Sequence, residues 1–365
     1  MGFRCGIVGL PNVGKSTLFN ALTATAAAAA ANYPFCTIDP NVGRVPVPDP
    51  RLDAIARLAK SARTVPTQLE FVDIAGLVRG ASKGEGLGNQ FLGHIREVDA
   101  IVHVVRCFAA GDVTHVEGSV DPIRDIETVE TELMLADLDS LEKRLAAAQK
   151  KAKGGDPEAK AQLDVMEPVA ALLRDGKLAR AFVPATERAL VFRLLQLLTA
   201  KPVLYVCNVE EEAAAEGNAL SARVFERARA EGARAVVISA AIEAEMAQLS
   251  DVERTEFLAH LDLGETGLAR VIRAGYALLN LITFFTAGPK EARAWTVRRG
   301  AKAPEAAGAI HSDFERGFIC AETISYEDYV GLGGEQAAKD AGKMRQEGRD
   351  YVVRDGDVIL FRFNV

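Results

Sequence analysis

Apolar residues in the first third of the chain, and again after residue 200, form short continuous runs separated by segments with helical spacing. Continuous apolar runs that alternate with helices are typical of strands in a parallel sheet covered on both faces. This pattern predicts a doubly wound α/β domain, and we expect its ligand at the carboxyl ends of the strands. The predicted strands cover residues 4–10, 68–74, 100–107, 202–208 and 235–240.

A long interruption of different character separates the third predicted strand from the fourth. Its leading apolar residues follow one another at the a and d spacing of a coiled coil. They are Met134, Leu138, Leu141 and Leu145. The sequence GGDP at 154–157 ends this helix and starts a second one. We therefore predict an antiparallel helical hairpin, inserted over residues 128–200, and interpret its Lys and Arg side chains as a solvated face.

The last part of the chain changes character again. Short strand-like runs occur at 291–300 and 351–365, and a hairpin turn is predicted within the second run at Asp355-Gly356-Asp357. These runs predict a small α+β domain over 282–365. The α/β domain then consists of two segments, residues 1–127 and 201–281.

Composition agrees with a globular protein and limits its partners. Of the 365 residues, 49% are apolar and 25% are charged, and the net charge is -7. This balance gives no general attraction to nucleic acid or to an anionic membrane. The five cysteines are widely spaced with no C-x-x-C pair, which suits a reducing compartment. No apolar run approaches the roughly 20 residues that span a bilayer, so we expect a cytoplasmic location.

Residues 9–17, GLPNVGKST, match the phosphate-binding loop G-x-x-x-x-G-K-[ST]. The match lies where this loop requires it, directly after a strand and before an amphipathic helix. Gly9 and Gly14 permit the tight turn that directs amide N–H groups inward, and these amides bind phosphate together with the helix N-terminus. The nucleotide-binding residues predicted here are Asn12, Val13, Gly14, Lys15, Ser16 and Thr17.

Two further segments join the phosphate-binding loop in a predicted phosphate and Mg²⁺ site. Lys15 is expected to reach the β- and γ-phosphate oxygens, while the Ser16 hydroxyl binds Mg²⁺. Asp73 and Gly76 have the D-x-x-G spacing, so Asp73 is expected to hold Mg²⁺ through water and the Gly76 amide to bond the γ-phosphate. Thr37 lies between the two motifs and is the candidate that completes the metal shell. The order of these elements predicts a switch-type P-loop NTPase.

The residue after D-x-x-G is unusual for this class. Many switch GTPases place Gln there to orient the attacking water, whereas this chain has Leu77, which forms no hydrogen bond with water. Slow intrinsic turnover is expected unless another group assists. His115, in a loop after a strand, is one candidate for orienting water, and a K⁺ ion held by Asn12 is another. The alternatives are a surface-loop histidine and an asparagine that caps its own turn.

The fourth predicted strand ends in CNVEEEA rather than in the N-K-x-D sequence that recognises guanine. Asn208 is present, but the Lys and the Asp are not. Without the Asp, no carboxylate selects the two adjacent donors of guanine, so the residues indicate that the protein is not a strict GTPase. Glu211 is a candidate for contact with the base, and Asn208 could brace the loop as well as touch the base. The backbone of Ser239 and Ala240 is expected to border the base.

With these motifs the chain resembles the YchF, or Obg-like ATPase, family of P-loop proteins. The stretches that carry the resemblance lie at 6–23, 32–49, 70–92, 271–288 and 291–319. The glycine-rich GASKGEGLGNQFL at 80–92 is the most specific of them. The resemblance implies a nucleotide-binding domain, an inserted helical hairpin and a C-terminal ubiquitin-like (β-grasp) TGS domain. It also implies that N-x-x-E, here Asn208 and Glu211, replaces the guanine motif and favours ATP.

The leading hypothesis is a Mg²⁺-dependent ATPase switch that binds the ribosome and regulates translation or a stress response. The resemblance supplies the ribosome as partner, and neither a membrane nor DNA is expected; we expect a monomer. A GTPase or dual-specificity NTPase is the alternative among enzymes. An adaptor that binds ribosome or RNA, and keeps its nucleotide only for structure, is the alternative from another class. Candidate partner surfaces are the helical hairpin and the basic stretch at 294–304.

Overall fold

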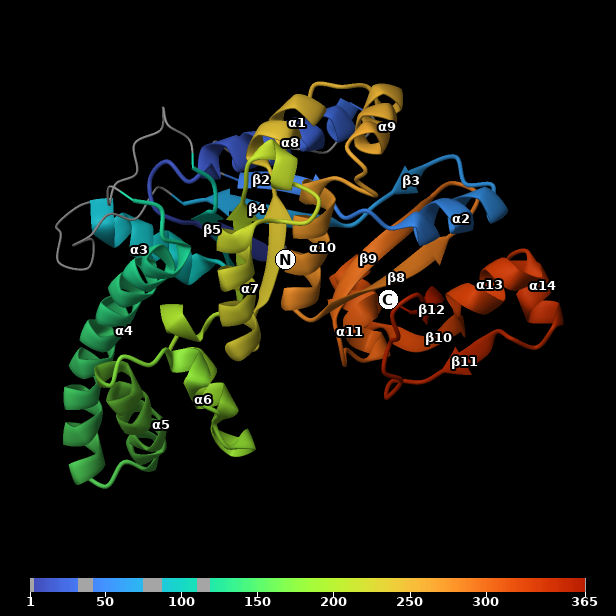
Figure 1. Ribbon diagram of the computed structural model, residues 1–365. Coiled ribbons are helices and arrows are strands. Elements are labelled where there is room, and N and C mark those ends of the chain that lie inside the picture. The colour runs from blue at the N-terminus through green and yellow to red at the C-terminus, as the bar shows by residue number, and fades with distance from the viewer. Residues whose placement is uncertain (1–2, 32–41, 75–86, 110–118, 365) are drawn as a thin grey trace.

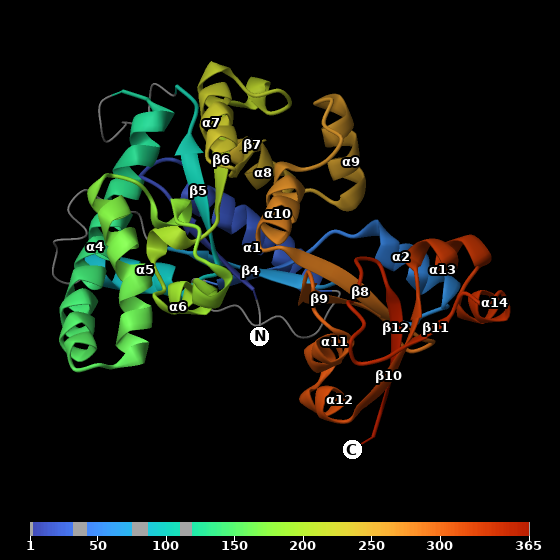
Figure 2. The same ribbon diagram turned by 90° about the horizontal axis from the view of Figure 1, so that it is seen from below.

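The computed structural model describes residues 3–31, 42–74, 87–109 and 119–364. A central α/β part carries the helical hairpin at one end and a second sheet, formed mainly by the C-terminal residues, at the other (Figure 1). The view from below gives the same arrangement (Figure 2). The predicted phosphate-binding loop at 9–17 therefore belongs to the central part, which carries the helical hairpin and the second sheet.

The central sheet confirms the predicted α/β fold. Its six strands have the order β2-β4-β1-β5-β6-β7, and the five predicted strands run parallel. Their carboxyl ends share one edge, which places the phosphate-binding loop beside the ends of β4 and β6. The strands are β1 (Arg4–Val8), β2 (Val42–Pro46), β4 (Gln68–Asp73), β5 (Ala100–Arg106), β6 (Val203–Asn208) and β7 (Arg234–Ile238).

Strand β2 was not among the predicted strands. It pairs antiparallel with β4 at the sheet edge, where Gly43 lies opposite Phe71. Its side chains alternate between half-buried and buried, with Val45 fully buried. This is the pattern of an edge strand with one face on the core. A run of five residues that contains Gly and ends in Pro is too short for that alternation to stand out in the sequence.

Helices cover both faces of the central sheet. In Figure 1, α7 and α10 flank strand β7 on opposite sides. Helix α1 continues through the alanines at 26–31, because alanine has the highest helix propensity. The helices are α1 (Lys15–Ala31), α3 (Leu87–Glu97), α7 (Ala219–Ala230), α8 (Ala240–Met246), α9 (Asp251–His260) and α10 (Gly267–Leu278).

The predicted helical hairpin is present. Its long helices are α4 (Pro122–Lys153) and α5 (Pro157–Arg174), and α6 (Ala189–Leu194) follows on the return path. Helix α4 begins inside the central part, where Ile126 and Val129 belong to the core of the α/β sheet. Its later turns have a separate core with α5, built from buried residues that include Leu141, Leu145, Met166, Val169 and Leu173. One continuous helix thus joins the two hydrophobic cores.

Asp137 fastens the returning chain to α4. This carboxylate is buried and accepts hydrogen bonds from the N–H of Leu198 (2.8 Å), the N–H of Thr199 (2.8 Å) and the Thr199 hydroxyl (2.7 Å). Asp137→Ala would leave these buried donors without an acceptor, so we expect a loss of about 2–4 kcal/mol in the free energy of unfolding. Urea unfolding measures the change. Asp139→Ala, at an exposed position on the same helix, is the control, and an equal effect of both substitutions would contradict the assignment.

The second sheet is mixed, as predicted for an α+β domain. Its order is β11-β10-β12-β8-β9-β3, and β3 is contributed by the N-terminal part of the chain. Helix α11 supplies buried alanines to the core on this sheet. The strands are β3 (Thr64–Val65), β8 (Leu281–Ala287), β9 (Ala292–Arg298), β10 (Phe318–Ile324), β11 (Arg345–Glu347) and β12 (Val358–Phe363). Its helices are α2 (Pro50–Leu58), α11 (Ala303–Ile310), α12 (Ser312–Arg316), α13 (Tyr326–Leu332) and α14 (Glu335–Asp340).

The hairpin predicted around Asp355-Gly356-Asp357 is wrong. The chain does turn there, and Gly356 has φ +95°. The segment before the turn, however, forms an isolated bridge from Val352 to Lys302, whereas β12 pairs with β10 and β8. The local motif set the position of the turn. Pairing with strands far away in the sequence decided which partners the flanking residues take.

Candidate nucleotide-binding site

The phosphate-binding loop connects β1 to α1, and close contacts with the strands behind it require its two glycines. Gly9 has φ +155° and Gly14 has φ +97°, a region that side chains rarely adopt. A Cβ atom on Gly9 would lie 2.4 Å from the carbonyl oxygen of Val104 on β5. A Cβ atom on Gly14 would lie 2.4 Å from the side-chain nitrogen of Asn208 on β6. The loop is therefore packed directly against the two strands that follow it in the sheet.

Lys15 begins helix α1 and is buried, with 9% of its surface exposed. Its Nζ donates a 2.7 Å hydrogen bond to the carbonyl oxygen of Leu10, within the same loop. Burial lowers the pKa of Lys15 to about 8, and the charge of Asp73 acts in the opposite direction. The ammonium group is thus held in the loop with little solvent, where an anion would stabilise it.

Asp73 is the last residue of β4, the strand next to β1. Burial raises its pKa, and the nearby Lys15 opposes this shift. For both groups, the cost of burying a charge is larger than the gain from their mutual attraction. A phosphate beside Lys15 and a cation beside Asp73 would compensate these charges, which is the chemistry expected of a metal–nucleotide site.

Asn208, the last residue of β6, braces this site from behind. It is buried, its Nδ2 donates to the carbonyl oxygen of Val13 (3.0 Å), and its Oδ1 accepts from the N–H of Ala240 (2.9 Å). The amide therefore connects the phosphate-binding loop to the start of α8. These hydrogen bonds give Asn208 the bracing role, and its contact with the base stays a prediction. One N–H of the amide nitrogen remains available for a further bond.

The other residues predicted to lie near the base have different environments. Glu211 begins the short 3₁₀ turn Glu211–Ala213 and is exposed. Ser239 is buried at the N-terminus of α8, and its hydroxyl has no hydrogen-bond partner among the described residues. Ala240 is buried beside it, with its N–H bonded to Asn208. Ser239 and Ala240 therefore lie beside Asn208, which also binds the phosphate-binding loop. Glu211 lies in the turn that follows β6.

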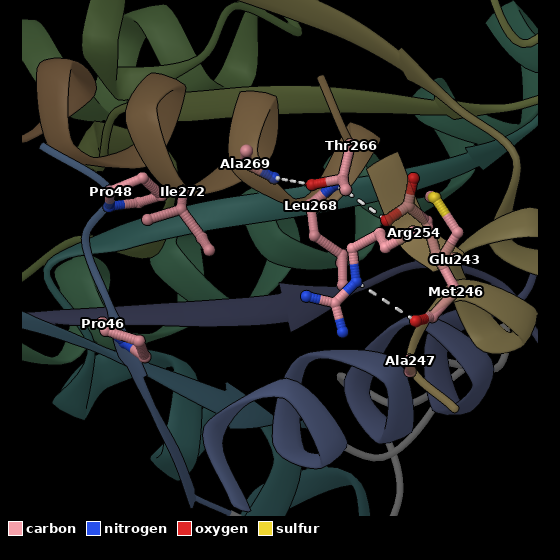
Figure 3. A pocket seen from close by; sticks show the side chains of 10 residues that line it. All are labelled: Pro46, Pro48, Glu243, Met246, Ala247, Arg254, Thr266, Leu268, Ala269 and Ile272. Carbon is pink, nitrogen blue, oxygen red and sulfur yellow. Dashed lines mark hydrogen bonds between the residues drawn. The ribbon is translucent and has the colours of Figure 1, made fainter. Parts of the chain in front are cut away.

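Glu243 connects α8, which begins at Ala240, to α10, the helix that leads into the second sheet. It is buried on α8 and accepts hydrogen bonds from the N–H groups of Gly267 (2.7 Å) and Leu268 (3.2 Å), at the first turn of α10. A carboxylate is favourable at a helix N-terminus. Glu243 also borders a cavity of about 200 Å³ between α8, α9, α10 and the segment after β2 (Figure 3). There Arg254 donates to the carbonyl oxygen of Met246 (3.3 Å), which ties α9 to α8.

Several predicted residues lie outside the described ranges, namely Thr37, Gly76, Leu77 and His115. Their roles stay predictions. Two other histidines, His94 and His103, lie within the described ranges. His94 is exposed on α3, while His103 is buried on β5 beside the Tyr205 ring, with 5.8 Å between the ring centroids. Burial lowers the pKa of His103 to about 3, so it stays neutral inside the sheet and does not act as a surface acid or base.

Sequence reasoning missed two residues that organise the site. Asn218 caps helix α7 through Oδ1, while its Nδ2 donates to the carbonyl oxygen of Cys107 (2.7 Å) and to Glu210 (3.0 Å). Glu243 caps α10. For Asn218, the sequence Asn-Ala-Leu-Ser before a helical pattern is a capping signal. Glu243 is 24 residues from Gly267, so no local signal marks it.

The pKa of Lys15 predicts how nucleotide affinity changes with pH. The ammonium form binds phosphate, and the folded protein loses it as the pH rises through about 8. We therefore expect the Kd for a nucleoside triphosphate to be about tenfold higher at pH 9 than at pH 7. Titration with a fluorescent ATP analogue over this range measures the change. A Kd that stays constant from pH 7 to pH 9 would contradict the predicted titration of Lys15.

Three features define a P-loop nucleotide-binding protein. They are the loop after β1, Asp73 at the end of β4, and Asn208 at the end of β6, which braces the loop. Residues 4–146 match the family described as 50S ribosome-binding GTPase, and residues 281–364 match the C-terminal family YchF-GTPase_C, described as a protein of unknown function. Relatives aligned over the full chain are 54–60% identical to this sequence. The chain belongs to the YchF family, which confirms the resemblance seen in the sequence.

Three relatives illustrate this membership. The "Ribosome-binding ATPase YchF" of Haemophilus influenzae is 60% identical over 100% of both chains, and that of Bacillus subtilis is 54% identical over 100% of both. The "Obg-like ATPase 1" of Pongo abelii is 47% identical over 99% of this chain and 92% of the relative. The solved structure of the Schizosaccharomyces pombe YchF GTPase has a TM-score of 0.88 and 38% identity, over 99% of this chain and 98% of the other.

Proposed function

We propose that the protein is a slow ATPase that acts as a nucleotide-dependent switch on the ribosome and regulates translation or a stress response. The observation that carries this proposal is the buried Lys15 and the half-buried Asp73 beside a phosphate-binding loop that Asn208 holds in place. Curated relatives at 54–60% identity are named ribosome-binding ATPases, which supports both the reaction and the partner.

Hydrolysis in this proposal uses charge and position more than covalent chemistry. The amides of the loop from Asn12 to Thr17 hold the α- and β-phosphates at the N-terminus of α1. Attack of water on the γ-phosphorus breaks its bond to the bridging oxygen, and negative charge moves onto the departing ADP. The buried ammonium of Lys15 neutralises that charge, and the Gly76 amide is proposed to bond the γ-phosphate.

The residues present fit a Mg²⁺ ion. Mg²⁺ in phosphate sites takes one or two carboxylates, and substrate phosphates and water complete its shell. Asp73 supplies the carboxylate and Ser16, in the first turn of α1, supplies a hydroxyl; Thr37 is the third proposed ligand. Held by these residues, Mg²⁺ would neutralise negative charge on the phosphates. The carboxylate of Asp73 carries the fit, because burial disfavours its charge unless a cation lies beside it.

Base selection in this proposal depends on the absence of the guanine-selecting aspartate. The side-chain oxygen and one N–H of Asn208 form the hydrogen bonds to Ala240 and Val13, so one N–H remains for the base. The hydroxyl of Ser239 is buried, and the backbone of Ser239 and Ala240 borders the base. Glu211 is exposed in the turn after β6 and is proposed to contact the exocyclic amine of adenine. None of these groups is a carboxylate held opposite the two adjacent N–H donors of guanine, which a site selective for guanine would need.

Water activation is assigned to groups other than the residue after D-x-x-G, because Leu77 forms no hydrogen bond. His115 and a K⁺ ion at Asn12 are the two proposed routes. Asn12 has φ +61°, a left-handed conformation that Asn tolerates better than most residues. If His115→Ala and exchange of K⁺ for Na⁺ both leave turnover unchanged, neither route operates.

The proposal also covers organisation and location. The nucleotide-binding domain comprises residues 1–127 and 201–281, the helical insertion residues 128–200, and a TGS domain of β-grasp type residues 282–365. The match of residues 281–364 to a separate family supports the last division.

We place the protein in the cytoplasm as a monomer, with no membrane or DNA partner. No helix within the described ranges is long and apolar enough to cross a membrane. Sedimentation of the purified chain tests the monomeric state.

Affinities for ATP and GTP, measured side by side by calorimetry and followed by turnover with and without ribosomes, test the proposed function. ATP is expected to bind more tightly, and ribosomes are expected to stimulate hydrolysis. Binding of GTP about tenfold tighter than ATP would instead establish a GTPase, the activity by which the solved Schizosaccharomyces pombe relative is named. Turnover that ribosomes do not change would favour the adaptor.

A further inference from the structure

Helix α6 exposes apolar side chains that a solvated helix would not carry. None of its six residues is buried, although its sequence is ALVFRL. Leu190 is 55% exposed and Leu194 is 66% exposed, while Val183, shortly before the helix, is 87% exposed. We call these three residues the α6 patch. Several exposed aliphatic side chains within twelve residues indicate a contact surface rather than scattered surface hydrophobics.

The α6 patch is presented on a fixed support. The rings of Phe182 and Phe192 pack with their centroids 5.4 Å apart, which holds the segment before α6 against the helix. At the other end, Nη1 of Arg144 on α4 donates to the carbonyl oxygen of Leu195 (2.9 Å). Asp137 holds the residues that follow, as described above. In both views α6 lies at the side of the hairpin that faces the C-terminal sheet (Figures 1 and 2).

A groove of about 310 Å³ continues the patch between α4, α5 and α6. Leu194 and Val191 form its α6 side, and Ala148 and Met166 are buried residues that also line it. Most of the residues that line the groove are therefore apolar. Such grooves accept the apolar face of an amphipathic helix.

Positive charge exceeds negative charge at the groove, where three cations stand against Glu158, the one carboxylate of the lining. Arg144 and Lys151 line its α4 side, and Arg193 is exposed on α6. None of these three forms an ion pair with a described residue. Some other cations of the insertion do have carboxylate partners, for example in three pairs. The pairs are Lys143–Asp139, Arg174–Glu142 and Arg188–Asp164. Unneutralised cations at the rim of an apolar groove favour a partner with carboxylates at matching positions.

We propose that the α6 patch and its groove bind an amphipathic helix of a ribosomal protein, with aliphatic side chains on one face and carboxylates beside them. This inference rests on the ribosome binding of the proposed function and names the surface that carries it. RNA phosphates would pair with these cations but would leave the exposed leucine and valine side chains without an apolar partner, so a helix with an apolar face fits the surface better. A second copy of the chain does not fit, because a self-complementary contact would oppose Arg144, Lys151 and Arg193 to themselves.

The first experiment measures co-sedimentation of the full-length chain with purified ribosomes in the presence of ATP. The double variant Leu190→Ser/Leu194→Ser is expected to bind at least about tenfold more weakly, whereas its ATP turnover without ribosomes stays at the wild-type value. The matched control is Val252→Ser on α9, because Val252 is 69% exposed but lies outside the patch. It is expected to bind ribosomes normally.

The outcomes separate this inference from the proposed function. If the wild-type chain does not co-sediment with ribosomes, the proposed function fails. If the wild type binds and the double variant binds equally well, only the α6 inference fails. Lys151→Glu/Arg193→Glu provides a second variant that keeps every apolar side chain. It is expected to weaken binding at low salt, and unchanged binding would overturn the assignment of an acidic partner.

The second experiment identifies the class of partner directly. A benzophenone amino acid in place of Leu190 is photo-crosslinked to purified ribosomes. A product that protease shortens and RNase leaves intact, of a mass that matches the chain plus one ribosomal protein, is expected. An RNase-sensitive product would assign the surface to ribosomal RNA, and a product of twice the mass of the chain would assign it to a second copy. Either of these two results would overturn the proposal.

Discussion

Asn208→Ala is expected to weaken the binding of ATP and GTP by the same factor, about tenfold or more. The substitution leaves the carbonyl oxygen of Val13 and the N–H of Ala240 without their buried partner. Each unsatisfied group costs about 1–3 kcal/mol, and the phosphate-binding loop loses its attachment to β6 and α8. Because the loop holds phosphates that both nucleotides share, the loss does not depend on the base. Calorimetric titration of the purified variant with each nucleotide measures it.

Glu212→Ala is the control, since Glu212 is exposed in the same acidic loop. It is expected to leave both affinities unchanged. A second comparison separates the two roles of Asn208. If Asn208→Ala weakens ATP binding and leaves GTP binding intact, Asn208 acts mainly by contact with the base, and the brace contributes little to nucleotide affinity.

Lys15→Met is expected to reduce ATP turnover by about a thousandfold, the loss typical of removing one preorganised charge-stabilising group. Methionine keeps the length and apolar character of the lysine stem and removes only the charge. Its side chain therefore fills the buried position without the cost of an isolated ammonium. Single-turnover measurements with saturating ATP separate this loss from weaker binding.

Lys201→Met is the matched control. Lys201 is a half-buried lysine whose pKa, like that of Lys15, is lowered by burial. Its Nζ donates to the carbonyl oxygens of Arg96 (3.1 Å) and Val98 (2.5 Å). Both of these contacts lie at the end of α3 and not in the phosphate-binding loop. Substitution of Lys201 is therefore expected to lower stability but not turnover. Equal loss of turnover in both variants would show that the effect of Lys15 comes from disturbed folding.

Much of the fold could be predicted because its signals are local. The five apolar runs of the parallel sheet are buried on both faces, so each forms a continuous run that is visible without any knowledge of its neighbours. The hairpin followed from the a and d spacing around Leu141, and the phosphate-binding loop from nine adjacent residues. The missing guanine-selecting aspartate after Asn208 was likewise a local observation.

Other features depended on residues that are far apart in the sequence. The partners of β12 illustrate this, because Asp355-Gly356 specifies a turn but does not say which strand lies beside Val358. Strand β3 joins a sheet whose other strands begin more than 200 residues later. Such pairings follow from how whole elements pack, and no short segment specifies them.

The sequence by itself determined that this protein holds a nucleotide phosphate and does not select guanine in the usual way, since both conclusions depend on the side chains of short contiguous motifs. Only the tertiary structure decided what Asn208 does. Its two partners, Val13 and Ala240, are 195 and 32 residues away, and they meet only when β1, β6 and β7 share one sheet edge. The exposure of Leu190 and Leu194 was also a tertiary result, because an apolar helix in a sequence is ordinarily expected to be buried.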